Sequence, residues 1–102
     1  MSAESGRTTL AGARQARAVT PEMEEEHTAA RLRFELGTAV RERRLELGIS
    51  QSELGRRSNL TQSAVARFEA GGTVPTLPVL DRLARALGLD LRVELVPHTA
   101  TA

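Results

Sequence analysis

The chain of 102 residues contains no cysteine, tryptophan, tyrosine or lysine. The absence of cysteine excludes disulfide bonds and thiolate-bound metal sites. No apolar run reaches the roughly 18 residues that a membrane-spanning helix needs, so no membrane partner is expected. Arg7, Arg14 and Arg17 have no apolar stretch between them, which argues against a secretion signal. These absences favour a cytoplasmic protein.

The net charge is only +1, so the overall basic excess typical of nucleic-acid-binding domains is missing. The charges are nonetheless unevenly distributed. Residues 21–35 are mainly acidic and carry Glu22, Glu24, Glu25, Glu26 and Glu35 against Arg31 and Arg33. Residues 41–67 are mainly basic and carry Arg41, Arg43, Arg44, Arg56, Arg57 and Arg67 against Glu42, Glu46 and Glu53. The basic region is the candidate contact for an anionic partner, although an ordinary solvated surface also explains this pattern.

The apolar pattern divides the chain into successive parts. Residues 1–20 have almost no large apolar side chains, which predicts a disordered tail. The sequence then predicts an N-terminal helical extension over 21–35, a main domain over 36–88, a strand over 89–96 and a tail over 97–102. A helix should begin at Pro21, because proline and glutamate both suit a first turn.

The helical pattern continues from Pro21 without a break to Leu47, and Gly48 supplies a left-handed cap. Gly37 lies near the middle of this segment and leaves open a division into two helices. The apolar residues Leu32, Leu36, Val40 and Leu47 fall near one face, with Phe34 and Leu45 beside it.

Three shorter helices follow, each with a recognisable start. Ser50 and Glu53 form a capping box, and Asn59 suits the turn after that helix because asparagine tolerates a positive φ. Thr61 caps a second helix that ends at Gly71-Gly72. Thr76 caps a third helix, whose apolar face is Leu77, Leu80, Leu83, Ala84 and Leu87 and which Gly88 closes.

Residues 51–68 match the apolar template of two short helices that cross at a sharp angle. Counted from Gln51 as the first, positions 4, 5, 9, 10, 15 and 18 are Leu54, Gly55, Asn59, Leu60, Val65 and Phe68. The large apolar residues pack the helices together. The fifth residue must be small because the second helix crosses close to it, and the ninth lies in the tight turn. A generic helical hairpin is the alternative.

The stretch from Leu36 to Leu89 resembles the Cro/cI-type (XRE) helix-turn-helix family. The matching residues include Gly48-Ile49-Ser50-Gln51, Phe68-Glu69-Ala70-Gly71 and Leu83-Ala84. Two departures are mild, since Gly55 stands where alanine is usual and Phe68 where isoleucine or leucine is usual. The resemblance covers about half the chain. It implies an all-α fold, a compact helical bundle of the lambda-repressor-like type that contains a helix-turn-helix.

The resemblance also implies how the chain would meet double-stranded operator DNA, because the second motif helix enters the major groove in this family. The matching base-reading residues are Gln62, Ser63 and Arg67, where glutamine suits adenine and arginine suits guanine. Phosphate contacts fall on Gln51 and Thr61 at two helix starts. Arg41, Arg43, Arg56 and Arg57 are candidates for a wider phosphate footprint. Alternatives are a solvated Gln62 and a salt bridge from Arg67 to Glu69 or Glu53.

The same family pairs an arginine of the first helix with the glutamate that ends the recognition helix. On this sequence the pair is Arg44 and Glu69, and we interpret it as a structural ion pair.

The C-terminal segment changes to strand periodicity, because Leu89, Leu91, Val93 and Leu95 alternate with Asp90, Arg92 and Glu94. A single strand is not stable alone. Pairing with a second copy in a homodimer is therefore expected, and packing against its own helices is the alternative. Dimerisation also suits palindromic half-sites one helical turn apart.

A helix-turn-helix domain followed by such a strand resembles bacterial antitoxins of the HigA and HipB kind. This resemblance implies an antitoxin that neutralises a small basic toxin, an RNase of the RelE or HigB type, and represses its own operon. Glu22, Glu24, Glu25 and Glu26 would then face the toxin, although they also suit a solvated helix start. A free-standing regulator of the same family, without a toxin, is the alternative.

No enzyme is expected. His27 and His98 are the only histidines, and the sequence has no catalytic triad, carboxylate dyad, metal-ligand cluster or phosphate-binding glycine loop. We therefore predict no cofactor, and a bacterial cytoplasmic location associated with the nucleoid when the protein is bound to DNA.

Overall fold

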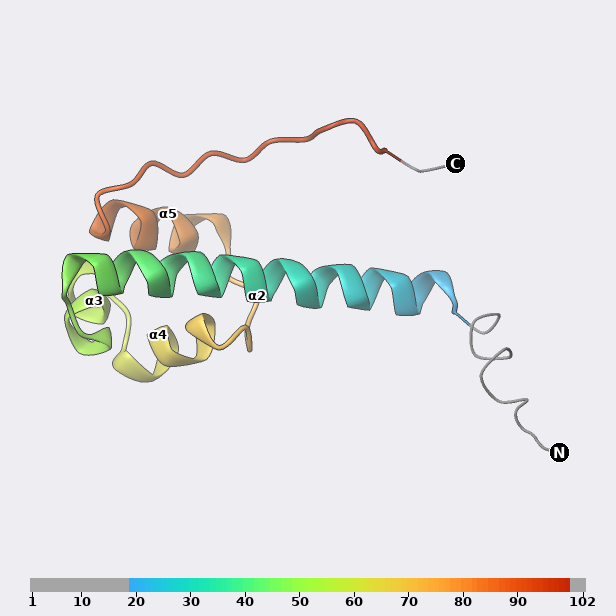
Figure 1. The fold of residues 1–102 in the computed structure, drawn as a ribbon. Helices are drawn as coiled ribbons and strands as arrows, with labels where there is room; N and C mark the ends of the chain where they lie inside the picture. Colours follow the sequence, from blue (N-terminus) through green and yellow to red (C-terminus); the bar gives the residue numbers. More distant parts are fainter. Residues whose placement is uncertain (1–18, 100–102) are drawn as a thin grey trace, which may run out of the picture. The chain divides into compact units, whose positions relative to one another are not determined.

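The computed structural model describes residues 19–99. Most of the disordered tail predicted over 1–20, and residues 100–102 of the tail predicted over 97–102, lie outside the described part. Within it the chain forms four helices: α2 (Pro21–Leu47), α3 (Gln51–Ser58), α4 (Gln62–Glu69) and α5 (Leu77–Ala86) (Figure 1). The all-helical part of the predicted fold is confirmed. No helix in residues 19–99 is long and apolar enough to cross a membrane.

The chain divides into two compact units, Met1–Leu32 and Arg33–Ala102. In the described part of the first unit, the Thr20 hydroxyl accepts the Met23 N–H at 3.1 Å and caps the start of α2. The helix begins at Pro21 as predicted and runs to Leu47 without a division at Gly37.

The core of the second unit consists of six buried apolar side chains: Val40, Leu54, Val65, Phe68, Leu83 and Leu87. Helix α3 packs against both α4 and α5. All the helices of this unit contribute to the core, and Leu87 comes from the cap of α5. This shared core positions the two short helices α3 and α4 against each other.

The buried face of α2 differs from the prediction. Of the four residues expected on an apolar face, only Val40 is buried, whereas Leu32, Leu36 and Leu47 are exposed. The buried residues of this helix are Gly37, Val40 and Arg44, which are spaced by three and four residues and so share one face. An apolar pattern cannot identify this face, because one of its members has no side chain and another is charged.

Gly37 lets α2 approach the end of α4 closely. A Cβ atom at this position would lie 2.4 Å from the Phe68 carbonyl oxygen and 2.8 Å from that of Glu69. Only glycine fits this contact without movement of the backbone. Its place in the helix therefore reflects close packing rather than a break.

The predicted helix ends are confirmed. Ser50, Thr61 and Thr76 are N-caps, and each side-chain oxygen accepts a backbone N–H three residues on. Asn59 adopts the left-handed conformation, with φ of 61°. The capping box is only half formed, because the Glu53 carboxylate binds Arg56 and Arg57.

The strand predicted over residues 89–96 is wrong for this structure, since no regular secondary structure follows α5 in the described chain. Leu89, Val93, Leu95 and Val96 are exposed, and Leu95 keeps 97% of its surface. A strand needs a neighbour to accept and donate its backbone hydrogen bonds. Residues 19–99 contain no second strand to serve as that neighbour.

Candidate nucleic-acid interface

Helices α3 and α4 form the candidate site, and their crossing depends on Gly55. A Cβ atom there would lie 2.6 Å from the Leu60 carbonyl oxygen. The chain turns between the helices at Asn59, whose N–H points back to the Arg56 and Gly55 carbonyls. Leu54 and Val65 are fully buried where the helices meet. The small residue, the turn and the apolar contacts of the sequence template are therefore brought together.

The outer face of α4 carries the three residues expected to read bases. Gln62, Ser63 and Arg67 are all exposed, and Ser63 and Arg67 lie four residues apart on the same side of the helix. Ala64 and Ala66 beside them are half-buried. Arg67 makes no ion pair within residues 19–99, where Glu69 pairs with Arg44, and Glu53 with Arg56 and Arg57. The salt bridge considered as an alternative role for Arg67 is thus absent.

A chain of hydrogen bonds links the buried side of this motif to its outer face. Arg44 donates to both carboxylate oxygens of Glu69, through Nε at 2.7 Å and Nη2 at 2.9 Å. The Gln51 Nε2 atom donates to the same carboxylate at 3.1 Å. The Gln62 Nε2 atom then donates to Gln51 Oε1 at 2.7 Å. The first residue of α4 is thereby tied to an ion pair at the other end of the same helix.

The direction of these hydrogen bonds follows from the carboxylate at their origin. An ionised carboxylate only accepts hydrogen bonds, so Gln51 must turn its amide nitrogen toward Glu69. The Gln51 carbonyl oxygen then faces Gln62, which must in turn present its own nitrogen. The Gln62 carbonyl oxygen is left outside this chain of bonds.

The Arg44–Glu69 pair is almost removed from water, with 9% and 3% of the two side-chain surfaces exposed. Burial raises the pKa of Glu69, but the hydrogen bonds from Arg44 and Gln51 prevail, so its pKa lies below the usual value. The hydrogen bond to Glu69 raises the pKa of Arg44. Arg44 also donates to the Ile49 carbonyl at 3.0 Å, which holds the loop before α3.

The residues expected to contact phosphates differ in whether their side chains already have hydrogen-bond partners in the protein. Thr61 caps α4, and Gln51 is half-buried and committed to its two partners. Arg43 donates to the Leu87 carbonyl at 3.0 Å and to Glu46 at 3.2 Å. Arg56 and Arg57 bind Glu53, whose pKa these hydrogen bonds lower to about 2. Arg41 is exposed.

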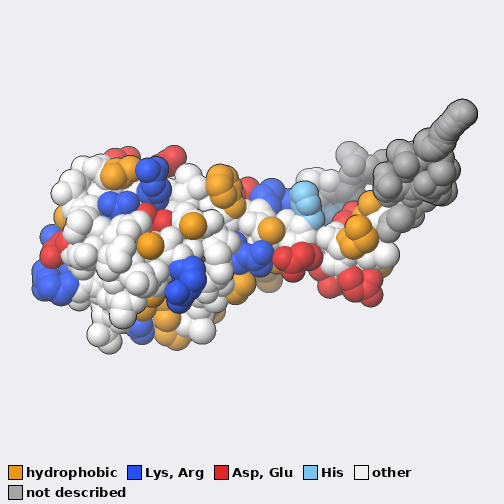
Figure 2. Space-filling view, turned by 90° about the horizontal axis from the view of Figure 1, so that it is seen from below, with side chains coloured by type: hydrophobic (Ala, Val, Ile, Leu, Met, Phe, Trp, Pro, Cys, Tyr) orange, Lys and Arg blue, Asp and Glu red, His pale blue; other side chains and the backbone are white. Residues whose placement is uncertain are grey.

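Three of the four arginines expected to contact phosphates, Arg43, Arg56 and Arg57, therefore already have acceptors within the protein. On the face drawn in Figure 2 the arginines of the second unit appear as separate patches with apolar and uncharged atoms between them. In the first unit, the same figure has acidic side chains gathered at the N-terminal part of α2, where Glu22, Glu24, Glu25 and Glu26 are exposed. Residues 19–99 contain no group of three or more acidic, histidine or cysteine side chains able to hold a metal ion.

Among the contacts that were not predicted from the sequence, two hold α3 to its neighbours α4 and α5. Gln62 reaches Gln51, eleven residues away. Arg82 of α5 donates to the Ser58 carbonyl at 2.9 Å and holds the end of α3. Neither contact has a local signal, because each joins polar residues whose neighbourhood depends on how the helices pack.

Comparisons with known proteins agree with this geometry. A model of the helix-turn-helix family matches residues 40–93. Over 53 residues the chain is 43% identical to an HTH-type transcriptional regulator of Methanothermobacter thermautotrophicus, covering 52% of this chain and 77% of that protein. Over 62 residues it is 32% identical to human endothelial differentiation-related factor 1, covering 61% of this chain and 42% of that protein.

A solved structure is also similar, that of the clp gene regulator ClgR from Corynebacterium glutamicum. The two share 29% sequence identity with a TM-score of 0.57, over 58% of this chain and 63% of that one. The chain thus spans less than two thirds of ClgR and less than half of the human factor.

Proposed function

This chain belongs to the XRE-type helix-turn-helix family of DNA-binding transcriptional regulators, and we propose that it is a sequence-specific repressor whose helix α4 reads operator DNA. The observation that carries the proposal is the outer face of α4. Three side chains able to bond base edges stand exposed there, above a motif that a buried ion pair holds in place.

We assign adenine recognition to Gln62 and guanine recognition to Arg67. Glutamine reads adenine by accepting from N6 and donating to N7, and arginine donates twice to guanine. The bond from Gln62 to Gln51 uses one N–H and leaves the carbonyl oxygen and the second N–H for adenine. Ser63 would bond a neighbouring base.

Phosphate oxygens would be held at the N-termini of α3 and α4, near Gln51 and Thr61, where backbone N–H groups and the helix dipole favour anions. Exposed Arg41 adds charge directly. Arg43, Arg56 and Arg57 would have to divide their N–H donors between their existing acceptors and the DNA phosphates.

The double variant Gln62→Ala with Arg67→Ala tests the base-reading role. The two lost bidentate contacts are worth about 1–3 kcal/mol each, so affinity for the preferred sequence should fall at least about thirtyfold. The operator is first selected from a randomised duplex library, and binding is then measured by fluorescence anisotropy.

Arg85→Ala is the matched control for lost charge, because Arg85 is an exposed arginine of α5 outside the proposed surface. It should leave affinity nearly unchanged. Equal binding by the double variant and the wild type would instead indicate a protein-interaction module that uses this fold without reading DNA.

We further propose a homodimer in which the C-terminal segment contacts a second copy. Four exposed apolar side chains in residues 89–96 support this assignment, because burying them against a partner removes apolar surface from water. Two copies would place two α4 helices on palindromic half-sites.

A chain that ends at Gly88 should sediment as a monomer and bind the selected operator much more weakly than the full chain. Removal of residues 97–102 alone is the control and should leave the dimer intact, since this tail carries no large apolar side chain apart from Pro97. A dimer that survives the longer deletion would place the interface elsewhere.

The more specific role of antitoxin is supported by the exposed Glu22, Glu24 and Glu25 at the start of α2, which would complement a small basic toxin. As an antitoxin, the protein would neutralise a toxin of the RNase type and repress the operon that encodes them both. A small basic protein that co-purifies in near-equal amount with the full chain from its host would distinguish this role from that of a free-standing regulator.

A further inference from the structure

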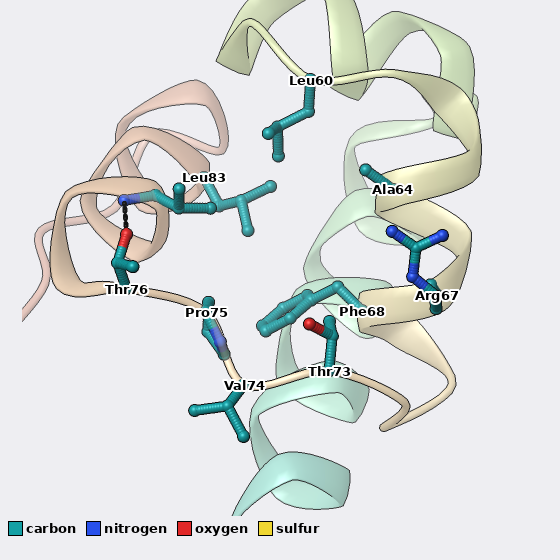
Figure 3. A pocket seen from close by; sticks show the side chains of 10 residues that line it. Leu60, Ala64, Arg67, Phe68, Thr73, Val74, Pro75, Thr76 and Leu83 are labelled. Carbon is teal, nitrogen blue, oxygen red and sulfur yellow. Dashed lines mark hydrogen bonds between the residues drawn. The ribbon is translucent and has the colours of Figure 1, made fainter.

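A cavity of about 210 Å³ lies beside the helix proposed to read DNA. It is open to solvent on one side and is lined by α4, the loop that follows α4, and α5 (Figure 3). Phe68 and Leu83, which are 3% and 0% exposed, form its floor. Leu60 and Val79 line it from the turn before α4 and from α5. All the lining residues belong to the second unit.

The interior of this cavity suits one small apolar group. An engineered apolar cavity of about 150 Å³ binds benzene, so a space of this size accepts a single aromatic ring. Binding pockets combine such apolar walls with a few polar groups that fix the orientation of the ligand. The polar groups here are at the rim.

Arg67 is the only charged residue among those that line the cavity. In Figure 3 its guanidinium extends along α4 between Ala64 and Phe68. Thr73 lies in the loop that follows α4, below Phe68 in this view. Within the described residues, neither side chain has a hydrogen-bond or ion-pair partner. A cation with its donors free at the mouth of an apolar cavity complements an anion, and a guanidinium matches a carboxylate with two parallel hydrogen bonds.

We propose that this cavity binds a small aromatic carboxylate, with its ring against Phe68 and Leu83 and its carboxylate on Arg67 and Thr73. Such a ligand occupies the same guanidinium donors that a guanine would need. It would therefore weaken DNA binding, a consequence that rests on the proposed role of Arg67. Binding of the carboxylate itself does not depend on that role.

The test is a titration of the isotope-labelled full chain with 3-phenylpropionate, followed by NMR, with neutral 3-phenylpropionamide as the comparison. The acid should give saturable shifts at the amides of Ala64, Phe68 and Val79, and bind at least about tenfold more tightly than the amide. Arg67→Gln should remove this preference, while Arg85→Gln should keep it. Shifts that are absent, or equal for acid and amide, overturn the site.

Ala64→Leu provides a second variant, because the larger side chain projects into the cavity from a half-buried position. It should weaken both compounds together. Unchanged binding by this variant would place the ligand elsewhere and overturn the proposal.

A competition experiment between 3-phenylpropionate and operator DNA tests the carboxylate site and the proposed DNA-reading function independently. Saturating 3-phenylpropionate should weaken binding of the wild type to its selected operator at least about tenfold, and the amide should not. Carboxylate binding without competition would refute the link to DNA reading while the site stands. A wild type that selects no DNA sequence would refute the proposed function, and the NMR result would still decide the site.

Discussion

We expect Glu69→Ala to lower the free energy of unfolding by about 3–5 kcal/mol, because the Arg44 guanidinium is left buried without its anion. Replacement of both partners, Arg44→Met with Glu69→Leu, should recover most of this loss, since neither charge then remains buried. Urea unfolding followed by circular dichroism measures both. If the double variant is as unstable as Glu69→Ala, the loss has another cause, such as poor packing.

The exposed pair Arg85–Asp81 is the matched control, because 75% and 41% of its side-chain surfaces face water. Asp81→Ala should cost less than about 1 kcal/mol. A similar cost for Asp81→Ala and Glu69→Ala would mean that burial does not set the strength of the Arg44–Glu69 pair.

The same pair should make stability depend on pH. The folded-state pKa of Glu69 is lowered, so its contribution is fully present above the ordinary glutamate value of 4.5 and is lost as the pH falls through the folded pKa. The wild type should therefore lose more stability on acidification below that value than the Arg44→Met, Glu69→Leu variant. Glu53 titrates in both proteins and cancels in the comparison.

Gly37→Ala should lower the free energy of unfolding about as much as Glu69→Ala does. Helix propensity alone would predict the opposite sign. Alanine in place of a helical glycine normally stabilises by up to about 1 kcal/mol. Here the new Cβ would lie 2.4 Å and 2.8 Å from two carbonyl oxygens at the end of α4. The backbones must separate, and we expect a loss of about 3 kcal/mol in urea unfolding.

Ala39→Gly on the same helix is the control for this experiment. Ala39 is exposed, so its replacement should report propensity alone, a loss of about 1 kcal/mol. A Gly37→Ala variant more stable than the wild type would show that α2 and α4 are not in close contact.

The main features of the candidate interface could be predicted from the sequence. The positions from Leu54 to Phe68 are recognisable because two crossing helices require large, small and turn-forming residues at set intervals. Their exposed neighbours on α4 follow from the same register. The link from Glu69 through Gln51 to Gln62 could not be predicted, because it joins three polar residues on different turns and helices. The cavity beside Arg67 also could not be predicted, because it depends on how α4 and α5 each pack against α3.

Local sequence signals are sufficient to set where the described helices start and end, because a serine or threonine cap, an asparagine turn and a glycine stop act on backbone groups within four residues. Tertiary structure decided which face of α2 is buried. That face is selected by Gly37, through close contact with α4, and by Arg44, through a carboxylate 25 residues away. Tertiary structure also explains why the C-terminal segment, residues 89–96, forms no strand. Its alternating pattern satisfies one requirement of a strand, but the hydrogen bonds of a strand must come from a neighbouring strand, which residues 19–99 do not contain.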